Sequence, residues 1–229
     1  MTARSTSARR GLTIVLLAAT CGVTPLLAGC ASTRIALKER FGYAKREQLV
    51  DRVEDARDAQ EVAKEQFNDA LEAFLSITGV DGGELEKRYN ALKGEYDSSR
   101  SRADAVNNRI GSVEDVATAL FREWNAELEQ YESATLRRSS EQSLRETERR
   151  YDQLIGAMQD ASSRMDPVLA AMNDQVLFLK HNLNARAIAS LSTELGAIES
   201  EVGTLIREME ASIAEANAFI DELQADNGG

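Results

Sequence analysis

The sequence has few of the residues that interrupt helices or build sheets. It holds two prolines in 229 residues, and aromatic residues make up 5% of the chain. After residue 30 the only proline is Pro167. Alanine, glutamate, leucine, arginine and glutamine dominate instead, and these residues favour long helices over strands. We therefore expect an all-α protein.

The chain also lacks the motifs on which common helical enzymes depend. Di-metal four-helix bundles use inward-facing Glu-x-x-His pairs, whereas this chain has one histidine, His181, with Phe178 three residues before it. No GxxxxGK[ST] or Gly-x-Ser-x-Gly motif is present, and "DGG" at residues 81–83 has no phosphate-binding lysine behind it. We expect no metal site, no cofactor and no enzymatic activity, and we interpret His181 as a polar turn residue.

Long apolar runs are absent except for one near the N-terminus, which includes one of the two cysteines. Residues 1–10 carry three arginines and no acid, and the run "GLTIVLLAATCGVTPLLAG" follows, closed by small residues. This three-part layout is typical of a secretory signal peptide. A membrane-spanning helix is the alternative, because the run has about the 20 residues that a span requires. Pro25 and several glycines and threonines weaken that alternative.

The stretch "LAGC", which ends at Cys30, closes this run. It resembles the lipobox of bacterial lipoproteins, in which a peptidase cuts before a cysteine that carries thioether-linked diacylglycerol. The resemblance implies a signal peptide over residues 1–29 and lipidation of Cys30. Several acyl chains on one cysteine form a lasting membrane anchor, since each buried CH₂ contributes about 0.8 kcal/mol. Cys21 would leave with the signal, so no thiol would remain for a disulfide or for catalysis.

The residue after the cysteine is Ala31 and not aspartate. By resemblance to Gram-negative lipoproteins, this implies transport to the outer membrane, with the chain facing the periplasm. Removal of the three arginines of the signal takes the formal net charge from -11 to -14. A chain this acidic argues against nucleic acid as a partner.

Apolar residues recur at alternating steps of three and four in four stretches, which is the pattern of helices with coiled-coil packing. The breaks between these stretches are "TGVDGG" (78–83), "ESATLRRSS" (132–140) and "HNLNARA" (181–187). Ser139 or Ser140 is expected to cap the third helix. We call each line of spaced apolar residues a seam. The seam of the third stretch keeps its phase past Asp166 and Pro167, so we expect a kink in the helix there and not a reversal of the chain. A few positions of this pattern are polar: Gln60, Ser99, Thr147, Gln175 and Ser212. The aromatic residues that fall on the pattern are expected to pack in the core: Trp124, Tyr89, Tyr96, Tyr131 and Tyr151.

Short connections make consecutive helices antiparallel. We therefore predict a long antiparallel four-helix bundle, with a three-helix, spectrin-like arrangement as the alternative if the last two segments fuse through Asn184. The predicted organisation is a signal peptide (1–29), a short tether (30–37), one helical bundle domain (38–225) and a disordered tail (226–229).

This topology places two basic stretches at the end of the bundle where the lipid would lie. We hypothesise that they contact anionic headgroups, each charge near the surface contributing about 1 kcal/mol. The alternative is that the arginines form ion pairs with nearby glutamates on a solvated helix. The residues concerned are Lys38, Arg40, Lys45, Arg46, Arg137, Arg138, Arg145, Arg149 and Arg150.

The same topology gathers polar residues at the opposite end, where we expect contact with an envelope protein: Asp81, Glu84, Lys180, His181 and Arg186. These expectations describe a lipid-anchored, non-catalytic spacer or adaptor. The alternative is a binding protein that holds a small apolar or lipid ligand between helices, as the alanine-rich seam and Met158, Met165 and Met172 suggest. Exposed heptad seams can also recruit a second copy of the chain.

Three stretches, "FGYAKREQLVDRVEDARDAQEVAKEQF", "LRRSSEQ" and "DQVLFLKHNLNARAIASL", together with the lipobox, carry a family resemblance. The chain resembles an uncharacterised family of Gram-negative lipoproteins catalogued as domain of unknown function 2959. The likeness covers nearly the whole mature chain. It implies a lipoprotein of the cell envelope and supplies no activity and no catalytic residue.

Overall fold

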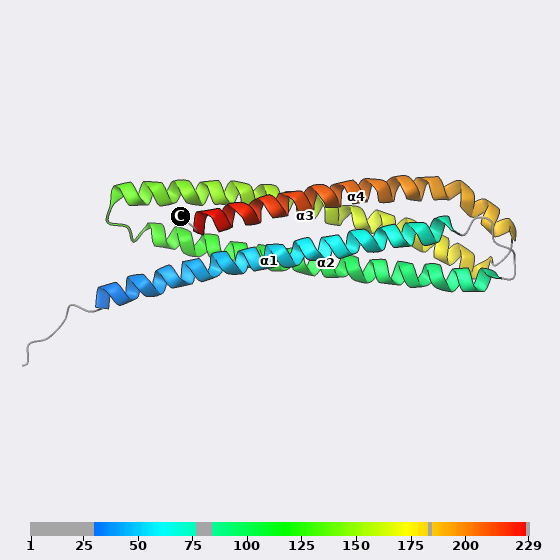
Figure 1. Cartoon of the computed structure of the whole chain (residues 1–229), viewed down its shortest axis with the longest axis horizontal. Helices are drawn as coiled ribbons and strands as arrows, with labels where there is room; N and C mark the ends of the chain where they lie inside the picture. The colour runs from blue at the N-terminus through cyan, green and yellow to red at the C-terminus, as the bar shows by residue number, and fades with distance from the viewer. Residues whose placement is uncertain (1–29, 77–83, 183–184, 228–229) are drawn as a thin grey trace, which may run out of the picture. The chain divides into compact units, whose positions relative to one another are not determined.

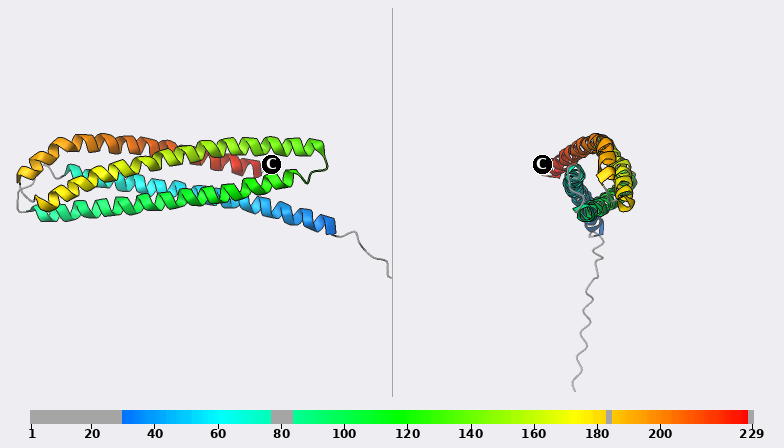
Figure 2. Two further views of the ribbon diagram at one scale, coloured as in Figure 1. Left: turned by 180° about the vertical axis from the view of Figure 1, so that it is seen from behind. Right: turned by 90° about the vertical axis from the view of Figure 1, so that its right-hand side faces the viewer.

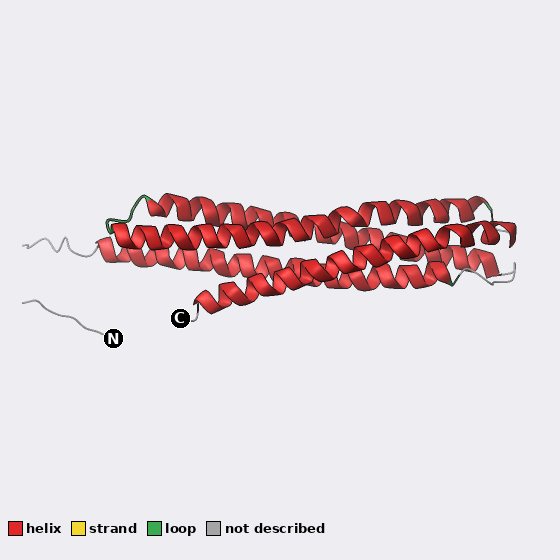
Figure 3. Ribbon diagram, turned by 90° about the horizontal axis from the view of Figure 1, so that it is seen from above, coloured by secondary structure: helices red, strands yellow, loops and turns green. Residues whose placement is uncertain are grey.

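The computed structural model describes residues 30–76, 84–182 and 185–227, and for residues 30–44, 185–194 and 226–227 it describes the backbone alone. These residues form four α-helices and no strand (Figure 3). The helices are α1 (Cys30–Leu75), α2 (Leu85–Leu128), α3 (Ala134–His181) and α4 (Ala185–Asn227). The chain divides into two compact units, Met1–Leu37 and Lys38–Gly229. Of the first unit, the structure describes the eight helical residues that begin α1.

The second unit is an antiparallel bundle in which consecutive helices lie side by side (Figures 1 and 2). Polar contacts identify each neighbouring pair and close the ring between the first helix and the last. They join Asp55 to Arg109, Glu114 to Gln159, Arg164 to Glu208 and Arg57 to Asn217. Because α3 ends at His181 and α4 starts at Ala185, the four-helix prediction is confirmed and the spectrin-like alternative is wrong. Pro167 lies inside α3, which continues through it as expected.

The predicted seams form the core. In α1, all the seam positions from Val53 to Phe74 are buried, including the polar Gln60. Most described seam positions of the other three helices are buried too, because residues spaced three and four apart lie on one face of a helix. Four aromatic seam residues are half-buried at the edge of the core: Tyr89, Tyr96, Trp124 and Tyr151. Large side chains that are almost completely buried come from all four helices: Phe67, Phe74, Leu92, Leu154, Met158, Met165, Met172, Leu205 and Met209.

Three local predictions are wrong. Tyr131 is 41% exposed, because α2 ends at Leu128 and the seam ends with it. The cap of α3 is Ser133 and not Ser139 or Ser140: its hydroxyl accepts from the backbone N–H of Leu136 and satisfies a donor of the first turn. Gln175 is half-buried, and Val176 takes the core position, since a step of four from Met172 follows the helix period better there.

The bundle has two ends, which we call the base and the distal end. The base holds the α2–α3 turn (residues 129–133), and the distal end holds the last turn of α1, the first turn of α2 and the last turns of α3 (Figure 1). Ion pairs set Glu208 level with Arg164 and Glu222 level with Arg150. By this register, the end of α4 is level with about residue 145, so the first three turns of α3 project past it.

Candidate functional site

A compact cluster ties the helices together at the base. The guanidinium of Arg46 lies 4.3 Å from the centre of the Trp124 ring, a distance typical of a cation–π contact. The Trp124 Nε1–H donates to Ser140 Oγ at 2.9 Å, which links α2 to α3. Lys45 and Glu123, which immediately precede Arg46 and Trp124 in the chain, form an ion pair with each other. The cluster therefore joins α1, α2 and α3 where the α2–α3 hairpin projects beyond α4.

Most of the basic residues predicted at the base have partners within the chain. Arg137 is held between Glu129 at 2.8 Å and Glu141 at 3.0 Å, and Arg150 reaches Glu222 on α4 at 2.5 Å. Arg145 lies 4.0 Å from Glu141. These acids neutralise much of the positive charge that the sequence places here.

The other basic residues predicted at the base either have exposed side chains or lie where the structure describes no side chain. Arg138 donates to the backbone carbonyl of Ala134 at 3.1 Å, and its side chain is exposed with that of Arg149. The side chains of Lys38 and Arg40 lie outside the described residues, as does that of Cys30. Contact between the base and anionic headgroups stays a prediction, which rests on Arg138 and Arg149 more than on Arg137.

The distal end exposes apolar side chains that the sequence analysis did not single out. On α3, Leu177 is 47% exposed and Phe178 is 38% exposed. Lys180 and His181 of the predicted contact set are exposed beside them. The sequence signal for this exposed surface is a pair of adjacent large apolar residues that lie off the core seam. Glu84 is exposed at the start of α2, while Asp81 and the side chain of Arg186 lie outside the described residues.

A polar layer crosses the middle of the core. Ser212 Oγ on α4 donates to Gln60 Oε1 on α1 at 3.0 Å, and both residues are fully buried. Gln60 Nε2 has no hydrogen-bond partner among the described residues, and neither has the hydroxyl of buried Ser99 on α2. Buried polar atoms without partners lower stability, so this layer is a weak point of an otherwise apolar core.

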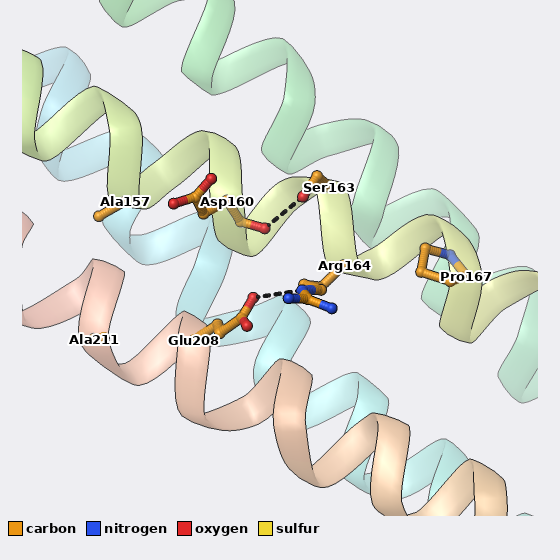
Figure 4. Close-up of a pocket in the computed structure, with 7 residues that line it drawn as sticks. All are labelled: Ala157, Asp160, Ser163, Arg164, Pro167, Glu208 and Ala211. Carbon is orange, nitrogen blue, oxygen red and sulfur yellow. Dashed lines mark hydrogen bonds and ion pairs between the residues drawn. The ribbon is translucent and has the colours of Figure 1, made fainter.

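A surface groove of about 540 Å³ lies between α3 and α4 (Figure 4). Asp160, Arg164 and Glu208 line it, and the ion pair between Arg164 and Glu208 crosses it at 3.1 Å. The methionines that suggested a ligand site lie in the core and do not line this groove. The lining mixes charged side chains with Ala157, Pro167 and Ala211, whereas most small-ligand sites are lined predominantly by apolar side chains.

Tyr151 on α3 is half-buried, and its ring meets Phe121 of α2 edge-on at 5.4 Å between centroids. Burial, together with the negative charges of Glu114 and Asp152, raises the pKa of its phenol from 10.0 to about 12. The phenol therefore stays neutral near neutral pH, as expected for a packing residue.

Among the described residues, none of the helices combines the length and the apolar character needed to span a bilayer. The same residues contain no cluster of three or more histidine, cysteine, aspartate or glutamate side chains placed to hold a metal ion.

No curated protein sequence matches the chain. A family described as "Protein of unknown function (DUF2959)" matches residues 35–223, which include most of α1, all of α2 and α3, and most of α4. Because this match spans most of the sequence, the chain belongs to the DUF2959 family.

Proposed function

We propose that this chain is a lipid-anchored lipoprotein of the cell envelope that acts as a non-catalytic helical spacer and presents its distal end to a partner in the periplasm. The observation that carries the proposal is the contrast between the two ends of the bundle. The polar side chains of the base are largely paired with one another, whereas α3 exposes Leu177 and Phe178 at the distal end. An exposed apolar pair next to charged residues is typical of a contact surface.

The dimensions of the chain support a spacer. With 48 residues and a rise of 1.5 Å per residue, α3 extends roughly 70 Å from base to distal end. Cys30 precedes Lys38, the first residue of the bundle unit, by eight residues. Eight residues reach at most about 28 Å even when fully extended. A lipid on Cys30 would therefore keep the start of the bundle close to the membrane surface.

Lipidation is tested by labelling cells with a clickable palmitate analogue and separating the inner and outer membranes. We expect label on the wild-type chain in the outer-membrane fraction and none on the Cys30→Ser variant. Cys21→Ser is the matched control, and it should be labelled like wild type because the signal peptide carries that residue away. Label that persists on Cys30→Ser would overturn the anchor.

Presentation of the distal end is tested with a photo-cross-linking amino acid introduced in living cells. The probe replaces Lys180 at the distal end and, as the matched control, Ser139 at the base, both of which are exposed. We expect a protein adduct from Lys180 and none from Ser139. Adducts only at Ser139, or at neither position, would contradict presentation of the distal end.

A further inference from the structure

Four exposed residues near the end of α3 form a diamond on one face of the helix. Asp174, Leu177, Phe178 and His181 follow the spacing i, i+3, i+4 and i+7, which places the two apolar residues in the middle and the two polar residues at opposite corners. All four are exposed, with Leu177 and Phe178 at 47% and 38%. Neither Asp174 nor His181 has an ion pair with another described residue of the chain.

Near the base, the same face of α3 is different. Four heptads earlier, the equivalent positions hold Glu146, Arg149, Arg150 and Gln153, and all are polar. The core seam of α3 keeps its phase between the two places, so both diamonds occupy the same side of the helix. Leu177 and Phe178 therefore form a small apolar patch on this face, which a partner can cover.

We propose that the distal diamond pairs with the same diamond of a second copy of this chain. In an antiparallel pair related by a two-fold axis through its centre, Asp174 of each copy lies against His181 of the other. The imidazole N–H can donate to the carboxylate whether the ring is charged or neutral. Leu177 and Phe178 pack at the centre against their counterparts, so one surface serves both copies, as in other two-fold interfaces.

The placement of the charges selects this orientation and this occupant. A parallel pair would set Asp174 beside Asp174 and His181 beside His181, which loses both hydrogen bonds and brings the carboxylates together. A single diamond is a small contact, well below the area of a stable interface, so the pair forms and separates readily. The antiparallel pair places the two bases at opposite ends, so two copies with their lipids in one membrane can pair only when both bundles lie along its surface. The inference therefore goes beyond the proposed spacer function and does not rest on it.

The pairing is tested by disulfide cross-linking of the full-length chain in cells. Leu177→Cys places thiols next to each other across the two-fold axis, and mild oxidation should give a covalent dimer on a non-reducing gel. Val62→Cys is the matched control, because Val62 is an apolar residue of similar exposure, 41%, on the surface of α1. The wild-type chain controls for Cys21 in precursor that has not been cut. A dimer yield from Leu177→Cys no higher than from Val62→Cys overturns the pairing.

Charge exchange tests the orientation in the Leu177→Cys background. Asp174→Lys alone and His181→Asp alone should each lower the dimer yield at least fivefold. The two changes together restore opposite charges across the axis and should return most of the yield. Because both positions are exposed, thermal unfolding of each variant should match that of its parent. A double variant that stays as low as the single variants overturns the antiparallel arrangement.

The experiments can overturn the spacer proposal and the pairing independently of each other. Capture of a different envelope protein at Lys180, with no dimer from Leu177→Cys, overturns self-pairing and leaves the spacer intact. A dimer from Leu177→Cys in a chain that carries no lipid label supports the pairing and overturns the anchor.

Discussion

The base and the distal end of the bundle both carry charged and large apolar side chains, and they differ in which of these are paired or covered. At the base, Arg46 covers Trp124 and Arg137 lies between two glutamates, so charged side chains complete the packing of the hairpin. At the distal end, Leu177 and Phe178 face solvent beside Asp174 and His181. The comparison shows that composition alone does not mark a contact surface: the arginine-rich base has most of its charges paired, while the less charged distal end keeps its side chains available.

The largest effect that tests this contrast comes from removing one aromatic residue at each end. Trp124→Ala deletes a half-buried ring, its contact with Arg46 and its hydrogen bond to Ser140, and should lower the free energy of unfolding by about 3 kcal/mol. Phe178→Ala should lower it by less than about 1 kcal/mol, since the ring is partly in water. Urea unfolding followed by circular dichroism measures both values. Equal losses at the two ends would remove the contrast.

Binding of the base to lipid is the next test. Replacing Arg138 and Arg149 by alanine in the chain from Ala31 onward should lower its association with anionic vesicles about tenfold or more, since each charge near the surface contributes about 1 kcal/mol. Arg137→Ala should have a weaker effect, because Glu129 and Glu141 already neutralise that guanidinium. Vesicle co-sedimentation measures the association. If binding does not depend on anionic lipid content, the base makes no electrostatic contact with headgroups.

Between the two ends, the polar layer offers a smaller effect on stability. Ser212→Ala removes the one donor to buried Gln60 Oε1 that the described residues provide, and should cost about 1 to 2 kcal/mol. Combining Ser212→Ala with Gln60→Met removes both polar groups from the layer and should leave the protein as stable as wild type or more so. Thermal and urea unfolding measure the two variants. A double variant less stable than Ser212→Ala would show that the layer contributes more than this one hydrogen bond.

The smallest expected effect is a pH dependence that involves Tyr151. The native state raises the pKa of this phenol to about 12, so it holds its proton where the unfolded chain, with a pKa near 10, releases it. The resulting stabilisation is fully present below about pH 10 and is lost as the pH rises towards 12. Tyr151→Phe should flatten the fall of the urea midpoint in this window and leave the midpoint near pH 7 almost unchanged. An unaltered slope would mean that Tyr151 does not set it.

Much of the fold follows from periodicity. The seam of α1 predicts its buried face residue by residue, because apolar side chains three and four apart can be buried together in only one way. The errors lie where the period ends. Tyr131 continues the spacing past the end of α2, and spacing alone cannot show that the helix has stopped three residues earlier, at Leu128. Ser133 caps α3 ahead of the predicted serines, because a cap depends on where the backbone leaves the extended conformation.

The candidate surfaces were less predictable. The sequence places arginines at one end of the bundle, but the partner of Arg150 is Glu222, which lies 72 residues further along the chain. The sequence shows Leu177 and Phe178 as two adjacent apolar residues off the seam of α3. How far each side chain is exposed follows only from the packing of the neighbouring helices.

The sequence by itself determined the helices, their antiparallel order and the face that each one buries, because these depend on local propensity, on short connections and on a spacing that repeats along the chain. Only the tertiary structure decided which charges are neutralised, where α4 stops short of the hairpin at the base and which apolar side chains stay in water. Those features depend on the register between helices that are distant in sequence, and register is set by the packing of whole faces against one another.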